Sequence, residues 1–248
     1  TLGLVNAPGG KPGTPLRKKD FLFISLLLFV FGIAAKGTYM LVGKVVQPQD
    51  IALVIHFFPV AGAAGLCALI FAARRYCVVG LLISLFACVM LKADLPLFLF
   101  FFLSAMLNTW LVIRAQSRQD VVIGIIPLAL GQIFIALGSG WLEGFRGGNT
   151  FLWLFGIVSL NAFISIAILF AISPIIEMAF RYTTRFRLME LMNLEQPLLQ
   201  DLMVASPGTY HHSLVVSNMV EAGAKAVGAN SLLCKVAALY HDIGKLAY

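Results

Sequence analysis

Hydrophobic and polar positions divide the chain into a long apolar part and a shorter polar part. Up to about residue 180, runs of apolar residues alternate with short polar segments. A helix needs about 20 apolar residues to cross a bilayer. We therefore predict six transmembrane helices, of which the third is short, over residues 21–43, 51–73, 76–92, 95–113, 121–142 and 150–179.

The pattern changes between residues 182 and 204, where leucines recur every three or four positions, as on one helix face. Pro197 either divides this segment into two short helices or starts the second one. We interpret the segment as an amphipathic linker that packs on the following domain, although a lever reporting the membrane state would need the same residues. The predicted face comprises Leu188, Leu191, Leu194, Leu198 and Leu202, and the solvent side Arg187, Glu190, Glu195 and Asp201.

Two further helices are predicted after the linker. The first starts at Ser206, where a hydroxyl is followed by proline, and runs to about Val227. After a glycine-containing turn, Asn230 or Ser231 caps the second helix, which continues to about Ile243.

Composition excludes an ordinary soluble protein. The 248 residues are 60% hydrophobic and only 12% charged, with a mean hydropathy of +0.93, whereas soluble domains are about 25% charged. The net charge of +7 points to membrane orientation more than to nucleic acid, because of where the basic residues lie. No CxxC spacing occurs, so we expect neither a metal nor a disulfide at Cys67, Cys77, Cys88 and Cys234.

Basic residues precede the first predicted span and follow the second, fourth and sixth. The positive-inside rule therefore predicts that both ends of the chain are cytoplasmic. The opposite loops carry only Lys44, Lys92 and Arg146. The cytoplasmic set is Lys11, Arg17, Lys18, Lys19, Arg74, Arg75, Arg114, Arg118, Arg181, Arg185 and Arg187.

A few polar residues lie within or near the predicted spans: Lys36, His56, Asn108, Ser159 and Asn161. Such residues can line a cavity or bind a ligand, but hydrogen bonding to a neighbouring helix is the favoured interpretation. No acidic or basic series runs through the spans, so an ion-coupled transporter gains no positive support.

Candidate chemistry concentrates in the last 40 residues. Antiparallel packing of the two helices places His212 and His241 within about one turn of each other, and imidazole with carboxylate suits Zn, Fe or Mn. On a helix the adjacent His241 and Asp242 point about 100° apart, so both reach one centre only near a helix end or groove. That arrangement fits two metals bridged by the carboxylate and favours phosphoester hydrolysis. We interpret His211 as a capping or surface residue.

The stretches LMELMNLEQPLLQDLM, PGTYHHSLVVSNMVEAGAKAVGAN and LLCKVAALYHDIGK resemble the seven-transmembrane receptors with an intracellular HD hydrolase domain. The resemblance is sharp over residues 185–248 and extends to the earlier part only in layout. It implies that His212, His241 and Asp242 are metal ligands, with Asp242 and Lys245 catalytic. Lys245 would contact a substrate phosphate, although a plain surface lysine is nearly as compatible.

The same resemblance implies hydrolysis of cyclic di-AMP to pApA with divalent metal ions, Fe or Mn and two in number. We expect an all-α protein, in which a polytopic helical membrane bundle precedes the N-terminal helices of an HD-type metal-dependent phosphohydrolase domain. The expected parts are a cytoplasmic segment (1–19), a six-span domain (20–181), the linker (182–204) and a partial HD domain (205–248). Further ligands are expected beyond Tyr248, so activity is expected of the complete protein rather than of this chain alone.

The expected setting is a bacterial inner membrane, with the lipid bilayer and a cyclic dinucleotide as partners, no nucleic-acid polymer, and self-association left open. Two alternatives remain. A receptor or signalling scaffold would carry a non-catalytic HD domain and lack intact later ligands. A transporter with an HD regulatory addition would show charged or discontinuous mid-membrane segments.

Overall fold

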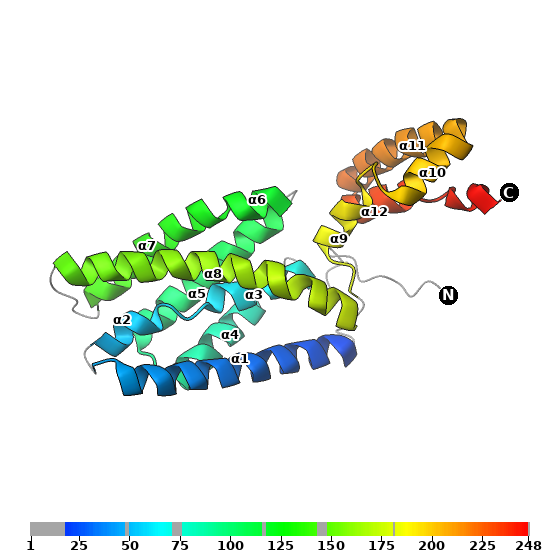
Figure 1. Cartoon of the computed structure of the whole chain (residues 1–248). Helices are drawn as coiled ribbons and strands as arrows, with labels where there is room; N and C mark the ends of the chain where they lie inside the picture. The colour runs from blue at the N-terminus through cyan, green and yellow to red at the C-terminus, as the bar shows by residue number, and fades with distance from the viewer. Residues whose placement is uncertain are drawn as a thin grey trace. The chain divides into compact units, whose positions relative to one another are not determined.

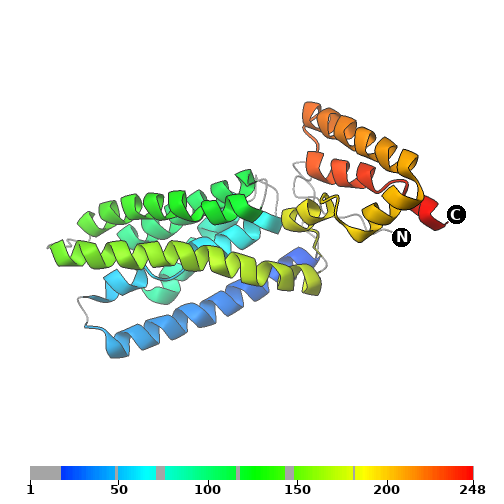
Figure 2. The ribbon, with the colours of Figure 1, turned by 45° about the horizontal axis from the view of Figure 1, so that its top comes forward.

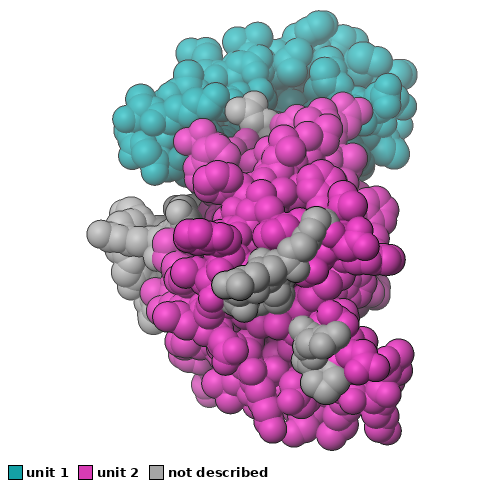
Figure 3. Space-filling model, turned by 90° about the vertical axis from the view of Figure 1, so that its left-hand side faces the viewer, with its two compact units in different colours: residues 1–14, 182–248 teal, residues 15–181 magenta. Residues whose placement is uncertain are grey.

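The computed structural model describes residues 18–47, 50–70, 76–115, 118–142, 148–180 and 182–247. Within these ranges every regular element is a helix, which confirms the all-α fold class (Figure 1). The described residues form two compact units, one within 18–180 and the other within 182–247 (Figure 3).

The first unit is a bundle of long apolar helices (Figure 2). Its centre is α3, whose ten residues from Val60 to Leu69 are all buried. A Cβ on Gly62 would lie 2.9 Å from the Ser165 carbonyl oxygen, so only glycine allows α8 to approach this closely. The helices are α1 (Lys18–Val45), α2 (Ile51–Ile55), α3 (Val60–Ile70), α4 (Tyr76–Leu91), α5 (Leu95–Arg114), α6 (Arg118–Ile123), α7 (Ile125–Leu142) and α8 (Gly148–Phe180).

Helices occupy each of the six predicted membrane ranges, and among the described residues five stretches are long and apolar enough to span, with 51–70 counted as one. The stretch predicted as short is α4, with 16 residues. At 1.5 Å per residue it is about 24 Å long, less than the roughly 30 Å of a hydrocarbon core. The predicted span over 51–73 is present in its described part, 51–70, but it contains a break that was not predicted, because the backbone leaves the helical path between α2 and α3.

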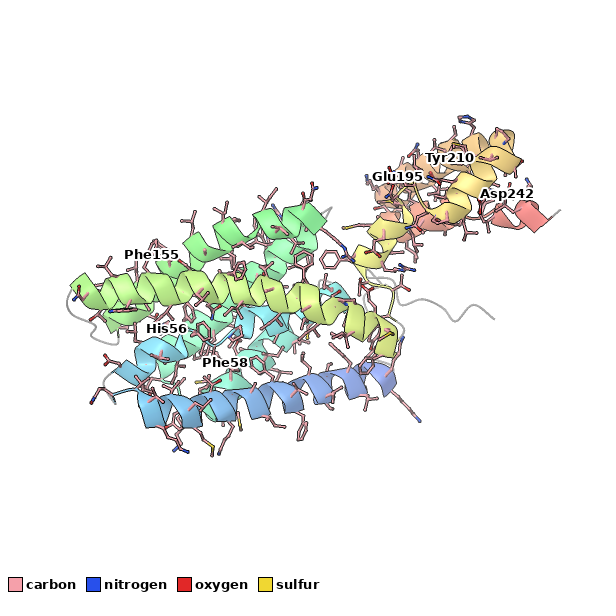
Figure 4. All side chains as sticks on the ribbon, in the orientation of Figure 1. His56, Phe58, Phe155, Glu195, Tyr210 and Asp242 are labelled. Atoms are coloured by element: carbon pink, nitrogen blue, oxygen red, sulfur yellow. The ribbon has the colours of Figure 1, made fainter. Side chains whose placement is uncertain are left out.

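Residues 56–59 form this break, which ends at Pro59. Proline has no amide donor and its ring clashes with a preceding helical turn, so carbonyls before it lose their helical partners. The side-chain amide of Asn161 on α8 donates to the His56 carbonyl at 2.8 Å and to the Phe58 carbonyl at 3.0 Å, where the Val60 amide is a second donor at 2.9 Å. His56 and Phe58 lie inside the bundle in Figure 4. Backbone groups at membrane depth require such internal partners.

The other polar residues of the spans also bond mainly between helices, as the sequence interpretation favours. The His56 Nε2 lies 3.3 Å from the Ser139 hydroxyl, and the Asn108 amide donates to the Ala61 carbonyl at 2.6 Å. Ser159 differs, because its hydroxyl donates to the Phe155 carbonyl of its own helix at 2.8 Å.

The second unit contains α9 (Arg185–Leu191), α10 (Pro197–Ala205), α11 (Pro207–Ala226), α12 (Ser231–Leu239) and the 3₁₀ helix η3 (Ile243–Ala247). As predicted, Pro197 starts a second short helix. The predicted leucine face is partly wrong, since Leu194 and Leu198 are 43% and 54% exposed. One continuous helix would have buried them, but the turn at 192–196 rotates α10 so that Leu199 is buried instead.

Candidate metal centre

The position of His212 is fixed by the buried face of α11. Tyr210 belongs to a hydrophobic cluster with Leu199, Leu202 and Leu239, and Tyr210 is labelled beside α10 in Figure 4. One helical turn after Tyr210, Ser213 is also buried. His212 points to the exposed side of the helix between these anchors.

A capped hairpin brings α12 back along α11. Gly228, with φ +67°, lies in the connecting turn, and the Asn230 side chain caps α12 by accepting from the Leu233 amide at 3.1 Å. Of the two predicted caps, Asn230 is therefore the one used.

The predicted end of this helix at about Ile243 is wrong, because α12 ends at Leu239. Beyond it the Ile243 amide bonds to the Tyr240 carbonyl and the Lys245 amide to the Asp242 carbonyl. These three-residue bonds tighten the chain into a turn and then η3. His241 and Asp242 consequently lie outside a regular helix, which frees both side chains to aim at one point.

The three predicted ligands meet at this turn. One donor atom from each of His212, His241 and Asp242 lies within 4.8 Å of the others. The two imidazole centroids are 5.7 Å apart with ring planes at 59°, and the His241 Nε2 is 3.5 Å from an Asp242 carboxylate oxygen. Donors held at about 2.1 Å from one ion are at most about 4.2 Å apart, so a small side-chain movement would complete a three-ligand site.

The His241 ring is oriented by a backbone carbonyl. Its Nδ1 lies 2.7 Å from the Ala238 carbonyl oxygen. A carbonyl only accepts, so Nδ1 carries a proton, which leaves Nε2, on the side of Asp242, as the nitrogen that can bind a metal. A metal-binding histidine commonly has its second nitrogen held in this way. The side chains remain accessible, with His241 39% and Asp242 23% exposed.

Lys245 lies beside the same carboxylate. Its ammonium donates to an Asp242 oxygen at 2.7 Å. This bond holds the pKa of Asp242 below its usual value; desolvation opposes it, and the nearby charges of His241, Lys245 and His212 act in the same direction as the bond. The donor set therefore includes a carboxylate that is ionised at neutral pH and can exchange its lysine partner for a cation.

Tyr240 is a contact that the sequence did not suggest. Its hydroxyl donates to the Leu191 carbonyl at the end of α9, at 2.9 Å. Burial raises the pKa of Tyr240, with Arg187 opposing it, so the hydroxyl stays a donor at neutral pH. The residue directly before His241 thus ties the site to the linker. In the sequence, the only sign of this contact is that an aromatic residue, Tyr240, directly precedes His241 and Asp242.

His211 does not join the group. Its exposed ring contacts the edge of Tyr210, with centroids 5.6 Å apart. The structure therefore brings together His212, His241 and Asp242, adds Lys245, and leaves His211 on the surface.

Comparison with curated proteins gives matches to cyclic-di-AMP phosphodiesterases named PgpH. The protein of Bacillus subtilis is 44% identical over 104 residues, which are 42% of this chain and 14% of that protein. The protein of Listeria monocytogenes is 44% identical over 90 residues, which are 36% of this chain and 12% of that protein. The chain thus aligns with only a small part of these relatives, and no solved structure matches it.

Two family profiles cover most of the chain. The HD domain profile matches residues 209–248, which contain His212, His241 and Asp242. The profile of the 7TM receptor with intracellular HD hydrolase matches residues 11–184, more than half of the chain. The apolar helical bundle and the following helices agree with these two matches in order. The chain therefore belongs to the family of 7TM receptors with an intracellular HD hydrolase.

Proposed function

We propose that this chain is part of a metal-dependent phosphodiesterase that hydrolyses cyclic di-AMP to pApA on the cytoplasmic face of a bacterial membrane. The convergence of two imidazoles and one carboxylate within 4.8 Å carries the proposal. The names of the Bacillus and Listeria relatives support the substrate. Neither observation depends on the other.

In this proposal His212, His241 and Asp242 hold a divalent ion. Such an ion supplies a water of lowered pKa and offsets phosphate charge. His241 presents Nε2 because the Ala238 carbonyl holds its other nitrogen. Lys245 stands at the rim, more than half exposed, where an ammonium released from Asp242 can bind a substrate phosphate. In its finer form, the proposal is that the metal is iron or manganese and that the site would hold two ions.

The cytoplasmic placement rests on the basic residues. Described examples are Lys18 and Lys19 at the start of α1, Arg114 and Arg118 between α5 and α6, and Arg187 on α9. Under the positive-inside rule they share one side of the membrane. We also propose that the membrane bundle regulates the site. Reporter fusions after residues 45 and 115 would test the orientation, because the two reporters should be labelled on opposite sides of the membrane.

Charged or discontinuous mid-membrane segments would support the transporter alternative, and the apolar stretch 51–70 is discontinuous at residues 56–59. In transporters, unwound carbonyls coordinate ions. Here the His56 and Phe58 carbonyls both accept from Asn161, so their freed acceptor capacity is used within the bundle. The break therefore favours a structural role over an ion site.

The deciding experiment uses the full-length protein loaded with Mn²⁺ or Fe²⁺. His241→Ala and Asp242→Ala are expected to lose metal and to lower conversion of cyclic di-AMP to pApA by at least about 100-fold, since removing an essential member of such a site costs several kcal/mol. His211→Ala is the matched control and should retain both. Undiminished turnover with full metal content in the two variants would refute the assignment.

A further inference from the structure

An open groove runs along the outside of the bundle between α1 and α4, which lie side by side in Figures 1 and 2. Its volume is about 460 Å³. The 18-residue apolar window of α1 is only 22% buried, so most of this helix faces outward. The groove is lined from α1 by Phe29, Ile33, Lys36 and Met40 and from α4 by Phe86 and Met90.

The shape of the groove suits an extended hydrocarbon chain. On α1 the lining positions recur every three or four residues from Phe29 to Met40, which forms one face about 16 Å long at 1.5 Å per residue. Gly32 lets the Phe86 ring pack on the α1 backbone as a floor, since a Cβ there would lie 2.8 Å from the ring. At Gly37, a Cβ would meet nothing within 4 Å, so the groove is open at that point.

Lys36 gives the groove its charge. It is exposed, and among the described residues no ion pair joins it to a carboxylate. It lies eight residues before Lys44, about 12 Å along the helix, in the half of α1 farther from the N-terminal end. A cation at this depth extends toward the headgroups and is stabilised by an anion.

A second cation stands at the same level. Lys92 directly follows α4, and its Nζ lies 5.7 Å from the centroid of the Tyr39 ring on α1. Tyr39 is one helical turn beyond Lys36. One ammonium group therefore lines the apolar groove and a second follows the helix that forms its other wall, an arrangement complementary to an acyl chain that ends in a negatively charged headgroup.

We propose that this groove binds one anionic phospholipid. An acyl chain lies along the α1 face from Ile33 toward Phe29, and the phosphate is held by Lys36. The groove shares no residue with the metal centre. The bound phospholipid belongs to the membrane leaflet that contains the end of α1 at Val45.

The experiment is native mass spectrometry of the detergent-purified chain with an equimolar mixture of dioleoyl phosphatidylglycerol and dioleoyl phosphatidylcholine. We expect preferential binding of the glycerol lipid. Lys36→Gln should reduce this preference about fivefold, the value of one lysine at a membrane surface. Lys36→Arg should keep it. Lys44→Gln removes a charge from the same helix outside the groove and should leave the preference unchanged.

A steric variant tests the groove separately. Gly37→Leu fills the open floor while keeping both cations, so bound lipid of either kind should fall. Gly43→Leu is the control on the same helix, where a Cβ also meets nothing within 4 Å. Equal binding of the two lipids by the unaltered chain, or equal effects of Lys36→Gln and Lys44→Gln, would overturn the proposal. A Gly37→Leu chain that keeps its lipid but loses self-association would instead identify the groove as a protein contact.

Discussion

The side-chain amide of Asn161 donates to the backbone carbonyl of His56 at 2.8 Å, across 105 positions of sequence. The same nitrogen also reaches the Phe58 carbonyl at 3.0 Å. The Asn161 oxygen accepts in turn from Gln132 at 3.3 Å and from the Ser165 hydroxyl at 3.2 Å. The side chain of Asn161 thus joins α8 and α7 to the break between α2 and α3, and both its nitrogen and its oxygen form hydrogen bonds.

Replacement of Asn161 by leucine should destabilise the membrane bundle. The buried His56 carbonyl would lose its side-chain donor, and the Phe58 carbonyl would keep only the Val60 amide. Such a loss costs about 1–3 kcal/mol for a buried group, although membrane hydrogen bonds average nearer 0.6 kcal/mol. We expect a loss of roughly 1–3 kcal/mol in denaturant unfolding of the detergent-solubilised protein. Ser159→Ala, two positions away and bonded only within its own helix, should change stability by less than about 0.5 kcal/mol. Similar midpoints for both variants would contradict this role.

Much of the fold could be predicted from sequence because apolar runs of helical length have few alternatives in a membrane. The break at residues 56–59 could not, since hydropathy averages over the uniformly apolar run around Pro59 and does not report a turn. Its stability depends on Asn161, a partner about a hundred positions away, which no local pattern identifies.

The candidate metal centre was likewise predictable from the sequence only in part. The His212 to His241 spacing predicted their approach, because two helices joined by a short turn pack side by side. The end of α12 at Leu239 could not be predicted, since apolar periodicity continues to Ile243. Three-residue backbone bonds and the Tyr240 contact with Leu191 decide it. That early end is what allows His241 and Asp242 to point the same way.

Tyr240→Phe should loosen α9 without removing a metal ligand. The variant loses the hydroxyl that donates to Leu191, a bond of about 1 kcal/mol, so hydrogen exchange of α9 amides should accelerate about fivefold. Tyr210→Phe removes a hydroxyl from the same hydrophobic cluster and is the control. Unchanged protection of α9 in Tyr240→Phe would show that the linker is held without this bond.

Two glycines of the α11–α12 hairpin should respond oppositely to alanine. Gly228 has φ +67°, where a Cβ costs about 1–2 kcal/mol, so Gly228→Ala should lower the unfolding temperature. Gly223 lies inside α11 with open space at its Cβ position. Gly223→Ala should therefore raise stability by roughly 0.5–1 kcal/mol. Thermal unfolding of the two variants in parallel checks the pair, and a shift of the same sign in both would be inconsistent with this turn.

Glu221 should make the hairpin sensitive to acid. Hydrogen bonds from Lys225 at 2.7 Å and Lys235 at 2.6 Å hold the pKa of Glu221 below its ordinary value, against a small desolvation effect. A carboxyl whose folded pKa is depressed contributes stability above its unfolded pKa of about 4.3, and that contribution is lost as pH falls through the folded value. The free energy of unfolding of the unaltered chain should exceed that of Glu221→Gln by about 0.5 kcal/mol at pH 7. The difference should vanish near pH 3.

Of the two lysines that bind Glu221, Lys225 forms a bond within one helix and Lys235 forms a bond between two helices, so their substitutions can be compared. Lys225 is four residues from Glu221 on α11 and 64% exposed, whereas Lys235 comes from α12 and is 26% exposed. Lys235→Gln should therefore lower the unfolding temperature more than Lys225→Gln, because water screens the exposed pair more strongly. Added salt should reduce the Lys225 effect first. If the two substitutions are equivalent at low salt and pH 7, Glu221 does not connect the helices energetically, and the hairpin is held by apolar packing alone.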